Sequence, residues 1–389
     1  MMKPAFLQPS QIELNGEALK NNIDFLKSRG HPDLCISGVI KGNAYGHGIS
    51  SWLPLAEEAG LRHFSVFSAN EAYGACRHKT HPETVIMIMG MIRDEELEWA
   101  IEEGVEFYLF DHERVEAAVT AAQKVGKKAK VHIQLETGMN RMGFPQEKWN
   151  LLFRQIKRAG ELELKGIATH FAGAESIANY FRIENQNRLF QSAISDAEKV
   201  LGYRPLCHAS SSAAFLTQPD KHYDMVRIGI AQYGFWPSRE TYMHYLKSEK
   251  VKPSKDPLQR VMTWKSEVMN IQQVESGEFI GYGNVYLAGV DMNIATVPIG
   301  YTHGFGRNLT NTGFVLIHGQ RCGVVGLVNM NMITVNVTHI DGVKKGDGVV
   351  LIGRQGEDEI TVASFGEMTN DLNYEVLTRI PSSIPRIAV

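Results

Sequence analysis

The chain has 389 residues, of which 43% are hydrophobic and 21% are charged, with a formal net charge of −3. This length allows two or three domains with large cores, and the weak charge does not favour a nucleic-acid-binding surface. The sequence contains no run of about 18 apolar residues, which a membrane-spanning helix would need. The first residues lack the apolar segment of a signal peptide. None of the four cysteines forms a CxxC pair, so we expect reduced thiols in a cytoplasmic protein.

Eight short apolar runs alternate with amphipathic stretches from about residue 30 to residue 235. They are nearly continuous and rich in β-branched residues, as buried parallel strands are. They span 34–40, 63–68, 84–90, 106–110, 130–135, 164–171, 204–210 and 224–230. Between them, 112–128 and 175–201 have the apolar spacing of helices. This alternation predicts an α/β fold with a (β/α)₈ barrel. A doubly wound sheet is the alternative, but no GxGxxG motif follows a strand.

The pattern changes near residue 238. Residues 239–259 are polar and charged and include two prolines, so we interpret them as a linker. Beyond them, short strands separated by Gly, Asn and Asp turns predict a mostly β domain, with one short helix at 362–370. We therefore predict a barrel domain over 1–240 and a C-terminal β domain over 255–389. The pattern leaves open whether a first strand at about 10–14 joins the C-terminal domain.

Lys41 is the first candidate for chemistry. In barrels of this type the functional site lies where the strands end, and Lys41 directly follows the first predicted strand. The loop after it contains Gly42, Gly46 and Gly48, which let the backbone approach a ligand closely. A partly desolvated lysine has a lowered pKa and can act as nucleophile and base. A solvated surface lysine is the alternative interpretation.

Other polar residues stand at the ends of other predicted strands, namely Arg141, His170, Ser210 to Ser212, Arg227 and Gly229. Each has a structural explanation of its own: a packed core histidine, half of an ion pair, or serines that cap the following helix. A helix N-terminus also suits a phosphate group. A lysine, a phosphate-binding loop and an arginine at one barrel face together indicate a phosphorylated aldehyde cofactor.

The segment around Lys41, VIKGNAYGHG, resembles the lysine motif of alanine racemases, which are fold-type III enzymes that use pyridoxal 5′-phosphate (PLP). Further motifs follow in the family's order and spacing: ETGMNRMGF, GIATHFAGAE, HASSSAA, MVRIGIAQYGF, GYGNVY, VPIGYTHGFGR, GLVNMNM, NYEV and IPRIAV. The resemblance covers almost the whole chain. It implies an isomerase that interconverts L- and D-alanine for peptidoglycan synthesis. It also implies a homodimer with shared active sites, with neither a metal, a nucleic acid nor a membrane as partner.

The resemblance also implies roles for individual residues. Lys41 would carry PLP and serve as the base for the D enantiomer, and Tyr282 of the other subunit would serve the L enantiomer. Arg141 and His170 would stabilise the tyrosinate, since a tyrosine with a pKa near 10 is a poor base at neutral pH. Arg227 would donate to the pyridine nitrogen without giving up a proton. The remaining implied contacts are His170, Tyr45, Ser212, Gly229, Ile230 and Tyr374 for the cofactor, and Arg141, Met330 and Tyr301 for the substrate.

The chain departs from the family pattern at four positions around the substrate entrance. Gln134 stands where many members carry a carbamylated lysine, so a neutral amide or a bound chloride would orient the arginine. Asn331 and His303 each replace an aspartate, and Asn140 replaces a glycine. These changes leave open a broader or different specificity, for serine, lysine or arginine.

Two further hypotheses belong to other functional classes. One is a PLP-binding protein without turnover, but such single-barrel proteins lack the β domain that carries Tyr282. The other is a fold-type III decarboxylase, which needs a catalytic cysteine in the β domain. Cys322 is the only candidate for that cysteine, and it lies outside the matching motifs.

Overall fold

A computed structural model of the chain describes residues 8–250, 256–369 and 371–389. The chain divides into two compact units. The barrel unit comprises Glu17–Lys41 and Leu53–Gln259, and the β unit comprises Met1–Gly16, Gly42–Trp52 and Arg260–Val389. Among the described helices, none combines the length and apolar character that crossing a bilayer requires.

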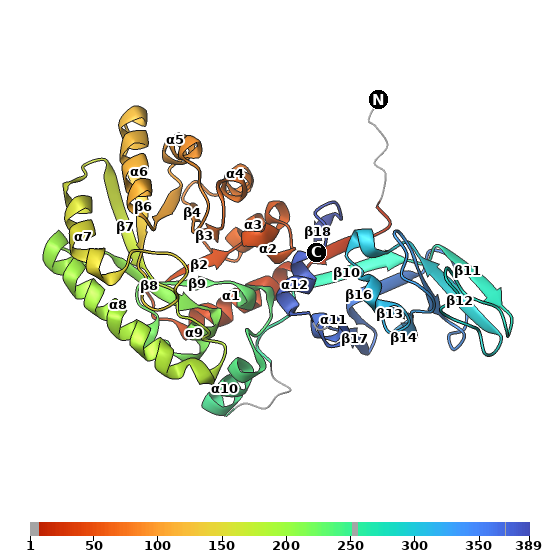
Figure 1. The fold of residues 1–389 in the computed structure, drawn as a ribbon. Helices are drawn as coiled ribbons and strands as arrows, with labels where there is room; N and C mark the ends of the chain where they lie inside the picture. Colours follow the sequence, from red (N-terminus) through yellow and green to blue (C-terminus); the bar gives the residue numbers. More distant parts are fainter. Residues whose placement is uncertain (1–7, 251–255, 370) are drawn as a thin grey trace. The chain divides into compact units, whose positions relative to one another are not determined.

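Eight parallel strands close into a barrel in the first unit (Figure 1). They are β2 (Cys35–Val39), β3 (His63–Val66), β4 (Val85–Ile88), β5 (Glu106–Leu109), β6 (Ala129–Gln134), β7 (Leu162–Ala168), β8 (Leu206–Ser211) and β9 (Met225–Ile228). Each pairs in parallel with the next, and β9 returns to β2 through pairs such as Ser37 with Arg227. All eight predicted strands are present, so the predicted fold class is confirmed.

Helices connect the strands and lie outside the barrel. They are α1 (Gly16–Arg29), α3 (Ile49–Glu58), α4 (Ala69–His78), α5 (Asp94–Glu102), α6 (His112–Val125), α7 (Trp149–Arg158), α8 (Tyr180–Leu201) and α9 (Ser212–Thr217). Local chemistry sets their ends. For α6, the Asp111 side chain accepts from the Arg114 N–H, and Gly126 ends the helix at φ +72°. The two helices predicted at 112–128 and 175–201 therefore exist, the second beginning a few residues later.

The predicted linker is wrong over its first half, because Arg239–Glu249 form helix α10. Its N-terminus is capped by Ser238, whose side chain accepts from the Thr241 N–H at 3.1 Å. Tyr245 is buried and packs edge-on against Phe25 at 5.7 Å between ring centroids. The capping hydrogen bond and the buried tyrosine ring stabilise a helix whose polar sequence predicted a linker. The second half of that stretch includes residues 251–255, which lie outside the described residues.

The second unit is mostly β. Its larger sheet has the order β14-β13-β16-β10-β1-β18, with β17 paired to β16, and a second sheet has the order β11-β12-β15. The strands are β1 (Gln11–Leu14), β10 (Met262–Glu267), β11 (Asn270–Val274), β12 (Met292–Val297), β13 (Phe314–Ile317), β14 (Gln320–Gly323), β15 (Ile333–Asn336), β16 (Gly348–Gln355), β17 (Asp358–Ile360) and β18 (Arg386–Ala388). Strand β1 pairs antiparallel with β10 and parallel with β18. Two short helices, α11 (Val362–Thr369) and α12 (Asn373–Thr378), precede β18, and α11 corresponds to the predicted short helix.

Candidate active site

Lys41 stands at the carboxyl end of β2 and opens an unusual turn, labelled α2 (Lys41–Tyr45). The next four residues, Gly42 to Tyr45, all have positive φ angles, between 49° and 63°. A left-handed conformation costs a residue other than glycine roughly 1–2 kcal/mol. Three such residues in a row, Asn43, Ala44 and Tyr45, therefore mark a strained segment, which is characteristic of functional sites.

Positive charges surround the Lys41 amine within the barrel unit. Its pKa is lowered by partial burial and by the charges of Arg141 and Arg227, against a smaller opposing effect of Glu71. Four side chains that the sequence placed at the ends of different strands, Lys41, Arg141, His170 and Arg227, thus influence one another at one end of the barrel.

His170 is held in its neutral form. Burial and the charges of Arg227, Arg141 and Lys41 lower its pKa to about 3. Its Nδ1 lies 3.5 Å from an Nη2 donor of Arg227. A neutral imidazole surrounded by cations can accept a hydrogen bond and donate another without adding charge.

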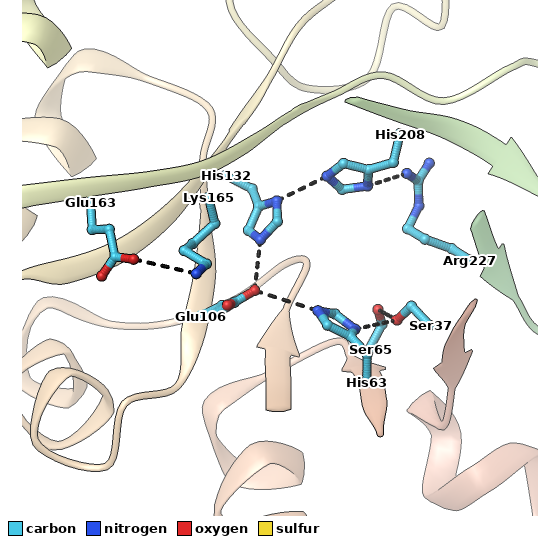
Figure 2. Close-up of polar contacts among 9 residues, drawn as sticks. All are labelled: Ser37, His63, Ser65, Glu106, His132, Glu163, Lys165, His208 and Arg227. Atoms are coloured by element: carbon cyan, nitrogen blue, oxygen red, sulfur yellow. Dashed lines mark hydrogen bonds and ion pairs between the residues drawn. The ribbon is translucent and has the colours of Figure 1, made fainter. Parts of the chain in front are cut away.

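Arg227 is the most enclosed of the four, with 5% of its surface exposed. Its Nη2 donates to the carbonyls of Thr169 at 2.7 Å and Ala209 at 3.1 Å, and its Nη1 donates to Nδ1 of His208 at 2.6 Å (Figure 2). No carboxylate lies within ion-pair distance of Arg227 in the described part of the chain. The alternative interpretation of Arg227 as half of a direct structural ion pair is therefore wrong.

Ser212 and Gly229 meet at the ends of β8 and β9. The Gly229 N–H donates to the buried Ser212 hydroxyl at 2.9 Å, where α9 begins and just before the 3₁₀ turn η4 (Ile230–Tyr233). The Ser210 hydroxyl donates instead to the Lys221 carbonyl at 2.6 Å, and Ser211 makes no side-chain capping bond. Ser212 is thus oriented toward a glycine turn, an arrangement suited to an anion, and the serines do not cap the helix.

The loop that presents Arg141 is organised by Glu136, which sequence reasoning did not single out. Its carboxylate accepts the N–H groups of Gly138 at 2.5 Å and Arg141 at 3.2 Å. Burial opposes ionisation of Glu136, but these backbone hydrogen bonds outweigh it and lower its pKa. Gln134 donates to the Leu135 carbonyl at 3.4 Å, and within the described residues it makes no hydrogen bond to Arg141.

Tyr108 is a second residue that sequence reasoning missed. It is 4% exposed, and its hydroxyl is one of few buried polar atoms without a hydrogen-bond partner in the described structure. Burial raises its pKa, against the opposing charge of Arg227. An unpaired buried hydroxyl is costly in a dry interior. Tyr108 is therefore suited to donate to a bound ligand or water.

In the β unit, three predicted residues line one cavity of about 350 Å³, namely Tyr282, Tyr301 and Met330. Tyr282 is 73% exposed on a turn between Gly281 and Gly283, both at positive φ, so it is not a core aromatic of a strand. Asn331 also lines this cavity and donates to the Thr302 hydroxyl at 3.1 Å. Of the four departures from the family pattern, Asn331 therefore lies beside this cavity.

Tyr45 and Tyr374 also lie close together in this unit, with ring centroids 5.8 Å apart. The contact depends on Gly46, whose φ is +79°. A Cβ there would lie 2.0 Å from the Leu377 carbonyl oxygen, so only glycine lets the lysine loop pack on α12.

A parallel α/β barrel with an amine, two guanidinium groups and a neutral imidazole at the carboxyl ends of its strands, joined to a β unit, has the organisation of a barrel enzyme with an amine nucleophile. Two family models match the chain: the N-terminal domain of alanine racemase over residues 14–237 and the C-terminal domain over 261–388.

Individual relatives agree with these models. An alanine racemase of Leptospira interrogans is 35% identical over 382 residues, which cover 98% of this chain and 96% of the relative. The solved alanine racemase of Clostridium difficile 630 matches with a TM-score of 0.89 and 30% identity over 99% of this chain and 96% of that one. The alanine racemase of Bartonella henselae was solved with covalently bound pyridoxal phosphate. It matches with a TM-score of 0.83 and 25% identity over 98% of this chain and 100% of that one. The chain belongs to the alanine racemase family and is an isomerase, which confirms the predicted family and reaction class.

Proposed function

We propose that this chain uses PLP to interconvert L- and D-alanine. The observation that supports this most strongly is the amine of Lys41 at the end of β2, with its pKa lowered beside Arg141 and Arg227. An amine with a lowered pKa is available as a nucleophile toward an aldehyde at neutral pH. The relatives, all named alanine racemases, favour alanine over serine, lysine or arginine as substrate.

The barrel residues fit PLP. Ser212 and Gly229, with the adjacent N–H of Ile230, would hold the phosphate, and Arg227 would face the ring nitrogen. The unpaired hydroxyl of Tyr108 offers one further donor. By resemblance, Tyr45 and Tyr374 would also contact the phosphate. When bound, PLP supplies the electron-withdrawing system that stabilises negative charge after the substrate loses its α-proton.

Racemisation needs one proton-transferring group on each face of the substrate. We assign the amine of Lys41 to the D enantiomer and the hydroxyl of Tyr282 to the L enantiomer. Tyr282 is exposed in the single chain, on a turn whose surroundings include the exposed apolar residues Phe279, Val285 and Leu287. These features favour a homodimer in which Tyr282 serves the barrel of a second copy.

Arg141 and His170 would assist Tyr282. A tyrosine must lose its proton to act as a base, and a nearby cation favours that loss. Because His170 is neutral, it can accept a hydrogen bond but adds no positive charge. Arg141 then supplies the positive charge that attracts the tyrosinate or the substrate carboxylate. With Gln134 directed at a backbone carbonyl, a chloride ion beside Arg141 would supply the missing negative charge.

Tyr301 and the backbone N–H of Met330 would contact the substrate at the cavity in the β unit. We further propose that the reaction supplies D-alanine for peptidoglycan in the cytoplasm. We also propose that the barrel (1–240) and the β domain (255–389) divide the work between cofactor binding and the second base.

The two hypotheses from other classes have less support. A PLP-binding protein without turnover would not need Tyr282 beside a substrate-sized cavity. A decarboxylase would need a reactive thiol, but Cys322 is fully buried, and burial raises its pKa to about 11.

A racemisation screen tests the proposal. Purified, PLP-loaded protein is incubated with each L-amino acid, and the D enantiomer is measured by chiral chromatography. We expect conversion of L-alanine to exceed that of serine, lysine and arginine. If one of those three is converted faster than alanine, that amino acid is the preferred substrate. If no amino acid is converted, the proposed activity is refuted.

A further inference from the structure

The interior of this barrel is unusually polar. Barrel interiors of this fold are normally filled by Val, Ile and Leu side chains. Here the inward positions of six strands carry charged or hydrogen-bonding groups instead, namely Ser37, His63, Ser65, Glu106, His132, His208 and Arg227. Figure 2 shows them joined in one continuous chain of hydrogen bonds. Such a network is unfavourable unless every member is hydrogen-bonded, and the function proposed above uses only Arg227 among its members, as a hydrogen-bond donor.

Three short contacts connect Arg227 to Glu106. Arg227 Nη1 lies 2.6 Å from His208 Nδ1, His208 Nε2 lies 2.9 Å from His132 Nδ1, and His132 Nε2 lies 2.8 Å from Glu106 Oε2. Beyond Glu106 the chain continues through His63, whose Nε2 lies 3.4 Å from the same carboxylate oxygen. The His63 Nδ1 then meets the Ser37 hydroxyl at 2.8 Å.

The chemistry of arginine fixes the direction of every bond in this segment. A guanidinium can only donate, so His208 Nδ1 must accept and the proton of His208 must sit on Nε2. That proton is donated to His132 Nδ1, so His132 in turn carries its own proton on Nε2. His132 Nε2–H then donates to the Glu106 carboxylate. Each imidazole is therefore neutral and polarised in the same sense, from Arg227 toward Glu106.

Burial supports this assignment of protons. His132 and His208 are both almost fully buried. Burial and the charge of Arg227 both lower their pKa values, although Glu106 opposes this at His132. Burial disfavours the Glu106 carboxylate, but the hydrogen bonds from His132 and His63 outweigh it and lower its pKa. The segment from Arg227 to Glu106 thus holds one cation and one anion at its two ends.

Neither charge has a closer counter-ion among the described residues. Within the described part of the chain Arg227 has no carboxylate within ion-pair distance, and the ion-pair partners of Glu106, which is 4% exposed, are His63 and His132. A buried charge without compensation is strongly unfavourable. No group of described His, Cys, Asp and Glu side chains is arranged to hold a metal ion, so a cation in place of protons does not explain the cluster.

We propose that Glu106 is the counter-ion of Arg227 and acts through His132 and His208 as a positioning residue for the guanidinium that faces the cofactor. The role of Arg227 rests on the proposed function. The polarised imidazoles draw the guanidinium onto His208 and fix its plane, and the remote carboxylate balances its charge. Arg227 then stays a fixed hydrogen-bond donor and does not become a proton donor at the ring nitrogen.

The first test uses the wild-type protein, with and without PLP. Labelling its histidines with ¹⁵N distinguishes a bare ring nitrogen from a protonated one by NMR. We expect both His208 and His132 to show a bare Nδ1 and a protonated Nε2 between about pH 6 and 8. The variants His208→Gln and His132→Gln supply the assignments. A proton on Nδ1 of either ring would overturn the proposal, and this result does not depend on enzymatic activity.

The second test compares Glu106→Gln with a matched control, Glu57→Gln. Glu57 is also a fully buried carboxylate, accepting from the Thr80 N–H at 2.7 Å and from the Thr80 and Thr84 hydroxyls, but it has no connection to Arg227. At metal sites, loss of a residue that orients a ligand typically reduces activity about 10–100-fold, and we take the lower end of that range for Arg227. We expect Glu106→Gln to keep the tautomers of His132 and His208, which Arg227 fixes, and to lower kcat about tenfold with little change in KM, because the charge that balances Arg227 is gone. We expect Glu57→Gln to reduce stability and leave tautomers and kcat unchanged.

Each outcome separates this proposal from the proposed function. An unchanged kcat in Glu106→Gln, or an equal loss of kcat in Glu57→Gln, would refute the role of Glu106. If Glu106→Gln does not fold, the histidine tautomers seen in the NMR spectrum of the wild-type protein test the proposal. If the wild-type protein racemises no amino acid, the proposed function fails, and the tautomers of the protein without PLP still test the counter-ion.

Discussion

Replacing Gly46 by alanine probes the loop that carries Lys41 without altering a polar group. The new Cβ would lie 2.0 Å from the Leu377 carbonyl oxygen, so the loop or α12 must move by about 1 Å. Its positive φ of 79° costs alanine about 1–2 kcal/mol, and overpacking adds about 1–3 kcal/mol. We expect Gly46→Ala to lower the free energy of unfolding by about 2–5 kcal/mol.

The same movement separates Tyr45 from Tyr374, both assigned to the phosphate. Gly126→Ala is the control, because Gly126 also has a positive φ, of 72°, but nothing lies within 4 Å of its added Cβ. We expect it to lose only about 1–2 kcal/mol. Urea unfolding measures both losses, and titration with PLP should show at least a roughly tenfold weaker affinity for Gly46→Ala alone. Equal unfolding midpoints and equal PLP affinity in the two variants would refute the steric argument.

Three further predictions concern single side chains. Tyr282→Phe should slow the exchange of the α-proton of L-alanine with D₂O far more than that of D-alanine, while leaving PLP affinity unchanged. Proton NMR measures both exchange rates, and equal slowing for the two enantiomers would exclude Tyr282 as the base for the L enantiomer. His47 is fully buried, and burial lowers its pKa to about 3. Between about pH 6.5 and 3 the unfolded chain therefore binds a proton on this histidine that the folded chain does not bind, so the free energy of unfolding falls as the pH drops through this range. His47→Gln should therefore reduce the slope of unfolding free energy against pH by about 1.4 kcal/mol per unit near pH 5, and an unchanged slope in urea titrations would contradict this. Cys322→Ala should keep the wild-type rate of racemisation in the same chiral assay, and a loss of activity without a loss of folding would reopen the decarboxylase hypothesis.

The barrel could be predicted from the sequence because each of its strands is a short apolar run on a regular alternation with helices. Helix α10 could not, because its buried contacts reduce to a few side chains such as Tyr245, and no apolar stripe distinguishes it from a polar linker. The one local signal was Ser238, an N-cap residue before an acidic first turn.

The site was predictable where a residue follows a strand, as Lys41 and Arg227 do. The left-handed turn was not, because Ala44 and Tyr45 carry no sequence sign of positive φ. The Glu106 network was also hidden. Its bonded partners lie 26 to 76 residues apart, and only closure of the barrel brings Glu106, His132 and His208 together. An acidic or histidine residue within an apolar run gives no indication of which distant side chain it will meet.

The rate at which PLP-loaded protein converts L-alanine into D-alanine, compared with that of Lys41→Ala prepared in the same way, tests the central claim most directly. Wild-type protein should carry the reaction to equal amounts of the two enantiomers. Lys41→Ala should neither retain the visible absorbance of bound PLP nor form D-alanine. Full racemisation by Lys41→Ala would contradict the assignment of this lysine as the group that carries the cofactor.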